Sequence, residues 1–242
     1  MTNDAQRALA DYDQMAEAYA DDNDRNPMNV SYERPTMLAM AGELGGRRVL
    51  DVGCAAGALS DALVARGASV VGIDINEHLV ERARRRLGGR AEFHVADISA
   101  PMPFLDSGSF DVVTASLVLH YLADWGSPLR EFHRVLRSDG ALLISTHHPV
   151  QDVDVTEPPA HYFETTLLTD TWRKGGREFK VRFYHRPLST IIDALADAGF
   201  LVERIPEPIP DQQAFAANPA FYERISRGPW FLFIRALKRP GS

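Results

Sequence analysis

The stretch VLDVGCAAGALS, residues 49–60, decides the fold of this chain. Its first four residues carry three apolar side chains and are typical of a buried strand. Gly53 and Gly57 follow, and glycine permits both a tight turn and a close approach of the backbone to a ligand. The stretch therefore predicts a strand, a turn and then a helix whose N-terminus points at a bound nucleotide.

The spacing of the glycines separates two nucleotide-binding motifs. A dinucleotide fingerprint requires G-x-G-x-x-G, but Ala55 stands where its second glycine would be. The stretch instead resembles motif I of the class I S-adenosylmethionine-dependent methyltransferases, acidic-x-G-x-G-x-G, with Asp51, Gly53, Ala55 and Gly57 at its positions. If the backbone at Ala55 needs a positive φ, its methyl group costs about 1–2 kcal/mol. Alanine at this position therefore affects the expected affinity for the cofactor, but not which cofactor is expected.

A second acidic residue ends the next apolar strand. Residues 69–74 close with Asp74, which stands about 20 positions after Gly53. In a doubly wound sheet a carboxylate there reaches the ribose of an adenine nucleotide, and its two oxygens can accept from both hydroxyls. Ile75 is expected to pack on the adenine face.

A third strand, residues 93–96, delivers Asp97 and Ile98 in the same way. In the resembling family an acid at this place accepts from the adenine amino group, while the next backbone N–H meets a ring nitrogen. The resemblance therefore implies that both residues contact the adenine. A plain turn carboxylate is the alternative at each strand end, but three in succession are much less expected by chance than one.

Further cofactor contacts are expected on either side of these strands. A fourth strand, residues 110–116, should place Ser116 and Leu117 beside the methionine part of the cofactor. In the resembling families an aromatic and a basic residue ahead of motif I fold over the cofactor, and Tyr19 and Arg34 match them here. Ordinary core packing is the alternative for both.

Residues 162–186 are typical of a β-hairpin with a four-residue turn at 173–176. An insertion after the fifth strand would lie over the carboxyl ends of the sheet, so the hairpin is predicted to be a substrate lid. Its removal is expected to leave cofactor binding largely intact. Alternation along its second arm places His185 on the apolar face and Tyr184 on the other.

Histidines supply the candidate general bases, because imidazole titrates near neutral pH. His120 follows the fourth strand, His147 and His148 follow the fifth, and His185 lies in the hairpin. A satisfied core histidine is the alternative for His185, and a register shifted by one residue would put Tyr184 in its place. Neighbouring strand residues face opposite sides, so the pair at 147 and 148 is not expected to share a metal, and no metal site is predicted.

The predicted fold is α/β, a three-layer, Rossmann-like, seven-stranded and mostly parallel sheet with helices on both faces. The chain divides into an N-terminal helical cap, an S-adenosylmethionine-binding core, an inserted lid and the C-terminal part of the sheet, over residues 1–46, 47–146, 147–186 and 187–242. Residues 21–27 are polar and tolerate disorder, and residues 206–219 are predicted as a polar loop. The last strand, near residues 230–236, is antiparallel by resemblance.

Composition limits the partners. The formal charge of −7 and the pI near 5.6 argue against nucleic acid, and the arginine run at 82–90 is predicted as a solvated helix face. Cys54 is the only cysteine, which leaves no intramolecular disulfide, and it is predicted as a small buried residue of the cofactor-binding turn. No apolar run reaches about 18 residues and the N-terminus is polar, so the expectation is a cytoplasmic protein without membrane span or signal peptide.

The predicted function is methyl transfer from S-adenosylmethionine to a small molecule, with S-adenosylhomocysteine as product, as in the type 11 or UbiE-like enzymes that the chain resembles. The sulfonium makes the methyl group electrophilic, so the protein has mainly to align an attacking O, N or C about 3 Å away and to remove a proton. Three alternatives stay open: a protein or RNA methyltransferase, a nicotinamide-dependent oxidoreductase, and a cofactor-binding protein without catalysis. The accepting molecule and the oligomeric state are not specified by the sequence.

Overall fold

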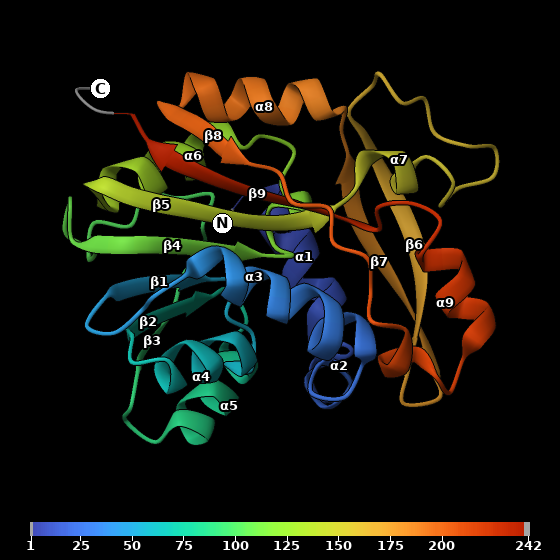
Figure 1. Ribbon diagram of the computed structural model, residues 1–242, viewed down its shortest axis with the longest axis horizontal. Helices are drawn as coiled ribbons and strands as arrows, with labels where there is room; N and C mark the ends of the chain where they lie inside the picture. The colour runs from blue at the N-terminus through green and yellow to red at the C-terminus, as the bar shows by residue number, and fades with distance from the viewer. Residues whose placement is uncertain (1, 240–242) are drawn as a thin grey trace.

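The computed structural model describes residues 2–239 and is built around one seven-stranded sheet (Figure 1). The strands lie in the order β3-β2-β1-β4-β5-β9-β8, and β9 runs antiparallel to both of its neighbours. Their bounds are β1 (Arg48–Val52), β2 (Ser69–Asp74), β3 (Glu92–Val95), β4 (Phe110–Ser116), β5 (Leu136–His147), β8 (Phe200–Arg204) and β9 (Phe231–Lys238). The predicted α/β fold, with its mostly parallel sheet and antiparallel last strand, is confirmed.

Helices cover both faces of this sheet (Figure 1). On one face lie α3 (Arg34–Ala41), α4 (Ala58–Ala65) and α5 (Glu77–Leu87), and on the other lie α6 (Gly126–Val135) and α8 (Leu188–Asp197). Helix α5 shows why these segments form helices and pack on the sheet. The Asn76 side chain accepts from the backbone N–H of Leu79 and caps the helix. An apolar stripe then runs from Leu79 to Leu87 and is buried against the sheet.

The strand order reverses between β1 and β4, which are hydrogen-bonded neighbours. The chain moves outward from β1 to β3 on one side and from β4 through β5 on the other. In such sheets the loops after the two central strands part and leave a crevice at the carboxyl ends of the strands. The turns that carry the predicted cofactor residues therefore meet at one edge of the sheet.

The N-terminal helices and a separate β-hairpin lie at that edge. Helices α1 (Asn3–Asp13) and α2 (Ala16–Asn23) and a π-helical turn (Met28–Glu33) precede α3, and a separate hairpin is formed by β6 (Thr166–Lys174) and β7 (Arg177–His185). Figure 1 shows the hairpin, α7 (Pro149–Asp152) and α9 (Pro219–Ile225) gathered at one end of the central sheet. The predicted alternation of the second arm is confirmed, because Phe179, Val181, Phe183 and His185 are buried and the residues between them are not.

Three local predictions are wrong. The hairpin turn holds only Gly175 and Gly176, with φ of 56° and 75°, since two glycines accept the left-handed conformation and let β6 continue to Lys174. The loop 206–219 contains a 3₁₀ turn, Gln212–Phe215, which buries an aromatic ring in the core.

The third wrong prediction concerns the polar run 21–27, where α2 extends to Asn23. Acidic side chains of this run pair with arginines of α5, as in the 2.8 Å contact between Asp21 and Arg82 and the contact between Asp24 and Arg86. These arginines therefore hold the N-terminal segment. The partners are about 60 residues apart in the chain, which no local pattern reveals.

Candidate functional site

The turn after β1 holds its backbone in the left-handed region at all three positions of the glycine motif. Gly53, Ala55 and Gly57 have φ of 69°, 46° and 79°. A Cβ at Gly53 would lie 2.6 Å from Cγ2 of Val118, and one at Gly57 would lie 3.0 Å from the Cβ of Ala83. Glycine is thus required at the first position by the β4 loop and at the last by the packing of α4 on α5, whereas Ala55 accepts strain.

The Asp74 carboxylate ties this turn to the end of β2. Its Oδ2 accepts from the Ala55 N–H and its Oδ1 from the Asn76 N–H, each at 2.9 Å. Burial raises the pKa of Asp74, while these amides act in the opposite direction. Each oxygen keeps a second lone pair for a ligand hydroxyl. Asp74 therefore supports the turn as well as offering acceptors to a ligand.

A cavity of about 690 Å³, here called the inner cavity, lies between these turns and α1. Eight of the predicted cofactor-binding residues line it: Tyr19, Gly53, Asp74, Ile75, Asp97, Ile98, Ser116 and Leu117. Helix α1 adds Ala5, Ala8 and Tyr12, which the sequence analysis missed as site residues. Helical spacing was the only signal that they carried.

Asp97 provides a direct indication of what the inner cavity can bind. Its Oδ1 accepts from the backbone and the hydroxyl of Ser99. Its Oδ2 is buried and has no hydrogen-bond partner among residues 2–239. A buried carboxylate oxygen without a donor is costly, so the site fits a ligand that brings an N–H group, as an adenine amino group does.

A smaller cavity of about 420 Å³ adjoins the inner one and is lined by Arg34, Asp51 and Cys54. Asp51 accepts from the hydroxyls of Ser60 and Thr114, at 2.5 and 2.8 Å. Burial raises the pKa of Asp51 to about 6, although both hydroxyls act against the shift. Asp51, the acid of motif I, therefore has its carboxylate fixed by hydroxyl groups of α4 and β4.

Glu33 lines the same small cavity and was not predicted. It is 4% exposed, and one carboxylate oxygen accepts from the hydroxyls of Ser116 and Ser145 at 2.7 and 2.6 Å. Burial raises the pKa of Glu33 against these two hydrogen bonds. Gly57, by contrast, lines none of the three cavities described in this subsection.

A wider hollow of about 2110 Å³, here called the outer cavity, opens beside the inner one. The two share Tyr12, Tyr19, Leu117 and Tyr121 as wall residues. Further aromatic rings of the outer cavity come from the hairpin, α9, β9 and the residue just before β9: Trp172, Phe183, Phe221, Phe231 and Trp230. The predicted lid thus forms one wall of the outer cavity.

Two of the predicted bases meet in this wall. His147 has its Nδ1 3.4 Å from an oxygen of Asp152, and its ring stacks on that of His120 at a centroid distance of 4.4 Å. Burial lowers the pKa of His120 well below its usual value, and its Nε2 has no partner among the described residues. His120 is therefore neutral near pH 7, and of these two histidines His147 is the one with a carboxylate neighbour.

The other predicted bases line none of the three cavities. His148 caps α7, and the Tyr184 hydroxyl donates to Asp4 at 3.1 Å on the opposite face of the hairpin. His185 is fully buried, with its Nε2 2.9 Å from the carbonyl oxygen of Tyr162. Its Nδ1 has no hydrogen-bond partner among the described residues, so His185 is buried as in the core-histidine alternative but only one of its ring nitrogens is satisfied.

Residues 2–239 contain no group of three or more His, Cys, Asp or Glu side chains placed to hold a metal ion. None of their helices is long and apolar enough to cross a membrane.

Comparison with known proteins shows the family to which the chain belongs. Residues 50–144 match the family model of a methyltransferase domain. The chain is 30% identical over 231 residues to an uncharacterized protein of Haemophilus influenzae, covering 88% of this chain and 90% of that protein. It is 35% identical over 126 residues to the ubiquinone biosynthesis O-methyltransferase of Pseudomonas aeruginosa, a match that spans only 51% of this chain and 52% of that enzyme.

Solved structures extend the likeness to nearly the whole chain. An S-adenosylmethionine-dependent methyltransferase from Mesorhizobium loti superposes with a TM-score of 0.68 at 26% identity, covering 89% of this chain and 99% of that one. Fold, site and relatives together define an S-adenosylmethionine-dependent methyltransferase. The chain belongs to the class I family of these enzymes, as its motif I indicated, and the family works by methyl transfer, not hydride transfer.

Proposed function

We propose that this enzyme transfers a methyl group from S-adenosylmethionine to a hydroxyl of an aromatic small molecule. The observation that carries the proposal is the outer cavity, which shares a wall with the inner cavity and presents His147, paired with Asp152, among aromatic rings. The name of the Pseudomonas relative, an O-methyltransferase of ubiquinone biosynthesis, supports an oxygen acceptor.

The inner cavity and its smaller neighbour are proposed to hold the cofactor. Asp74 would accept from the ribose hydroxyls, and Asp97 and Ile98 would meet the adenine; the buried Oδ2 of Asp97, which has no donor among residues 2–239, supports this. Tyr19, Arg34, Ser116 and Leu117 would surround the methionine part. When bound, the cofactor supplies an electrophilic methyl group.

The residues of the outer cavity would orient the acceptor and take its proton. Aromatic walls favour a planar ring, which they contact by edges and faces. Nδ1 of His147 lies 3.4 Å from an oxygen of Asp152, and with the ring proton on Nδ1 the other nitrogen, Nε2, is the acceptor. That nitrogen can then remove the hydroxyl proton as the oxygen attacks.

The test is a methylation assay read by mass spectrometry with phenols, catechols, aliphatic amines, peptides and transfer RNA as acceptors. We expect methylation of phenols or catechols only. His147→Gln should lower kcat by about 10²–10⁴-fold while the Kd for the cofactor stays the same, because a general base contributes that much. The matched control is His78→Gln at an exposed position of α5.

Two outcomes would count against the proposal. Methylation of peptides or RNA in place of phenols would contradict the acceptor class and return the macromolecular alternative. Unchanged turnover in His147→Gln would contradict the assignment of the base.

A further inference from the structure

One buried carboxylate connects the hairpin to the outer cavity. Asp152, the last residue of α7, is 4% exposed. Its Oδ1 lies 3.4 Å from Nδ1 of His147 at the end of β5, and its Oδ2 lies 3.8 Å from Nδ1 of His185 at the end of β7. A single acid therefore faces two histidines from different sheets, and only His147 lines the outer cavity.

The protonation of His185 follows from its surroundings. Its Nε2 lies 2.9 Å from the carbonyl oxygen of Tyr162, and a carbonyl only accepts, so Nε2 carries a proton. A neutral ring would then turn an unprotonated Nδ1 toward Asp152, which places two acceptors face to face. A second proton on Nδ1 converts this contact into an ion pair. Burial lowers the pKa of His185, but Asp152 and the Tyr162 carbonyl outweigh it and the pKa is raised.

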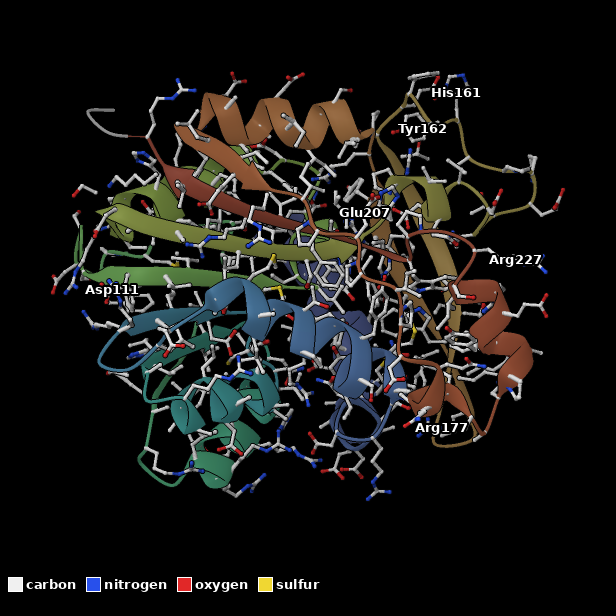
Figure 2. The ribbon with its side chains drawn as sticks, viewed as in Figure 1. Asp111, His161, Tyr162, Arg177, Glu207 and Arg227 are labelled. Carbon is white, nitrogen blue, oxygen red and sulfur yellow. The ribbon has the colours of Figure 1, made fainter. Side chains whose placement is uncertain are left out.

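Other charged groups nearby do not replace this pairing. Arg186 is buried with its guanidinium 4.6 Å from the centre of the Trp125 ring, and its charge opposes a second positive charge on His185. His148 directs its Nε2 toward Glu207, at 3.7 Å, and His120 stacks on His147 as a neutral ring. Figure 2 shows Tyr162 and Glu207 at the same end of the molecule as α7. Asp152 is the acid that lies within 4 Å of both His147 and His185.

We propose that Asp152 and His185 are positioning residues of the acceptor site. The buried imidazolium of His185 balances the Asp152 carboxylate, and Asp152 holds His147 with its Nδ1 protonated and its Nε2 as the base. The inference rests on the proposed role of His147. It gives the hairpin a function beyond covering the acceptor, because β7 supplies the histidine that faces Asp152 from the side opposite His147.

The two variants should differ in the size of their effect. Without Asp152, His147 loses the carboxylate contact that fixes its ring. Without His185, Asp152 keeps its contact with His147 but loses the histidine on its other side.

The experiment measures kcat and the acceptor KM at saturating cofactor, together with the cofactor Kd, for the wild type, His185→Gln, Asp152→Asn and the control His78→Gln. In Asp152→Asn kcat should fall by more than about tenfold, and in His185→Gln it should fall by less, while the acceptor KM and the cofactor Kd stay within about twofold of the wild type. A lower melting temperature with kcat per folded molecule unchanged in both variants would show structural residues only and overturn the inference.

A measurement on the wild type avoids the risk that a variant fails to fold. Nitrogen-15 NMR of histidine-labelled protein near neutral pH should find both ring nitrogens of His185 protonated. A neutral His185 in an active enzyme would overturn this inference and leave the proposed function intact. A wild type that methylates none of the acceptors would instead overturn the proposed function, whatever the state of His185.

Discussion

The inner and outer cavities share a wall but are built differently. The inner cavity is made mostly by turns that follow successive strands, between residues 53 and 122, with α1 and Tyr19 added over them. The outer cavity collects side chains from α1, β5, α7, the hairpin, α9 and β9. The cofactor side is thus fixed by local turns, while the acceptor side depends on tertiary contacts between distant segments.

The largest effect is expected from deleting the hairpin, which tests whether the hairpin is a lid that can be removed from a folded protein. Its buried side chains Leu168, Phe179, Val181 and Phe183 form one cluster with residues of α1–α2 and the β4 loop. Their burial contributes roughly 1.5–3 kcal/mol each, or about 6–12 kcal/mol together, which is comparable to the whole stability of a domain, and a deletion would remove it and uncover Met15 and Tyr121. Deleting residues 166–185 should therefore abolish folding, as measured by thermal unfolding, contrary to the expectation from sequence that cofactor binding survives.

A milder variant tests the same connection in a folded protein. Asp11 of α1 accepts from the backbone and guanidinium of Arg182 on β7. Because α1 lines the inner cavity, Asp11→Ala should weaken cofactor binding, while the exposed Glu17→Ala should not. A deletion variant that folds and binds cofactor like the wild type would restore the separable lid.

The next effect is confined to the inner cavity. Asp74→Ala should weaken cofactor binding by roughly 2–4 kcal/mol through loss of two charge-assisted hydrogen bonds. It should also lower the free energy of unfolding by about 1–3 kcal/mol for each amide that loses its acceptor, those of Ala55 and Asn76. Calorimetry and chemical denaturation measure the two losses separately.

The conservative variant Asp74→Asn further separates the loss of stability from the loss of cofactor affinity. Asp74→Asn retains one acceptor oxygen and should recover more stability than affinity, and Glu81→Ala on the exposed face of α5 serves as the control. An unchanged cofactor Kd in Asp74→Ala would reduce Asp74 to a strand-end residue that only supports the turn.

These contrasts explain what the sequence could and could not predict. Asp74 and Asp97 could be found because a buried strand followed by a turn is a local pattern, and parallel strands bring their ends together. Glu33 could not, since its hydrogen-bond partners Ser116 and Ser145 lie 83 and 112 residues away. The pairing of Asp152 with histidines of two different sheets has no local signature either.

The hairpin likewise has one feature that its sequence predicts and another that depends on tertiary contacts. Its alternation predicted correctly that His185 faces inward, because the period of a strand is local. Alternation could not tell whether the inward side meets a cavity or a packed core, which depends on where α7 and Tyr162 lie. The turn was predicted too long because two consecutive glycines, not the four residues around them, complete it.

The smallest effect concerns Ala55, the one departure from motif I. Its φ of 46° costs about 1–2 kcal/mol for a residue with a Cβ, and glycine would remove that cost. Glycine also has more freedom in the unfolded chain, which offsets about 0.5–1 kcal/mol. Ala55→Gly should therefore stabilise the fold by about 1 kcal/mol or less. The control is Ala56→Gly, a buried position without positive φ, which should destabilise it.

The same substitution tests whether the two cavities act separately. Ala55 lines the inner cavity and its neighbour but not the outer one, so relief of its strain should leave kcat unchanged. If part of the strain is borne only by the ligand-bound turn, cofactor affinity should rise by up to about fivefold, the equivalent of 1 kcal/mol. A kcat that changes with Ala55→Gly while the cofactor Kd does not would show that the β1 turn controls the acceptor side, and the division between a local cofactor site and a tertiary acceptor site would fail.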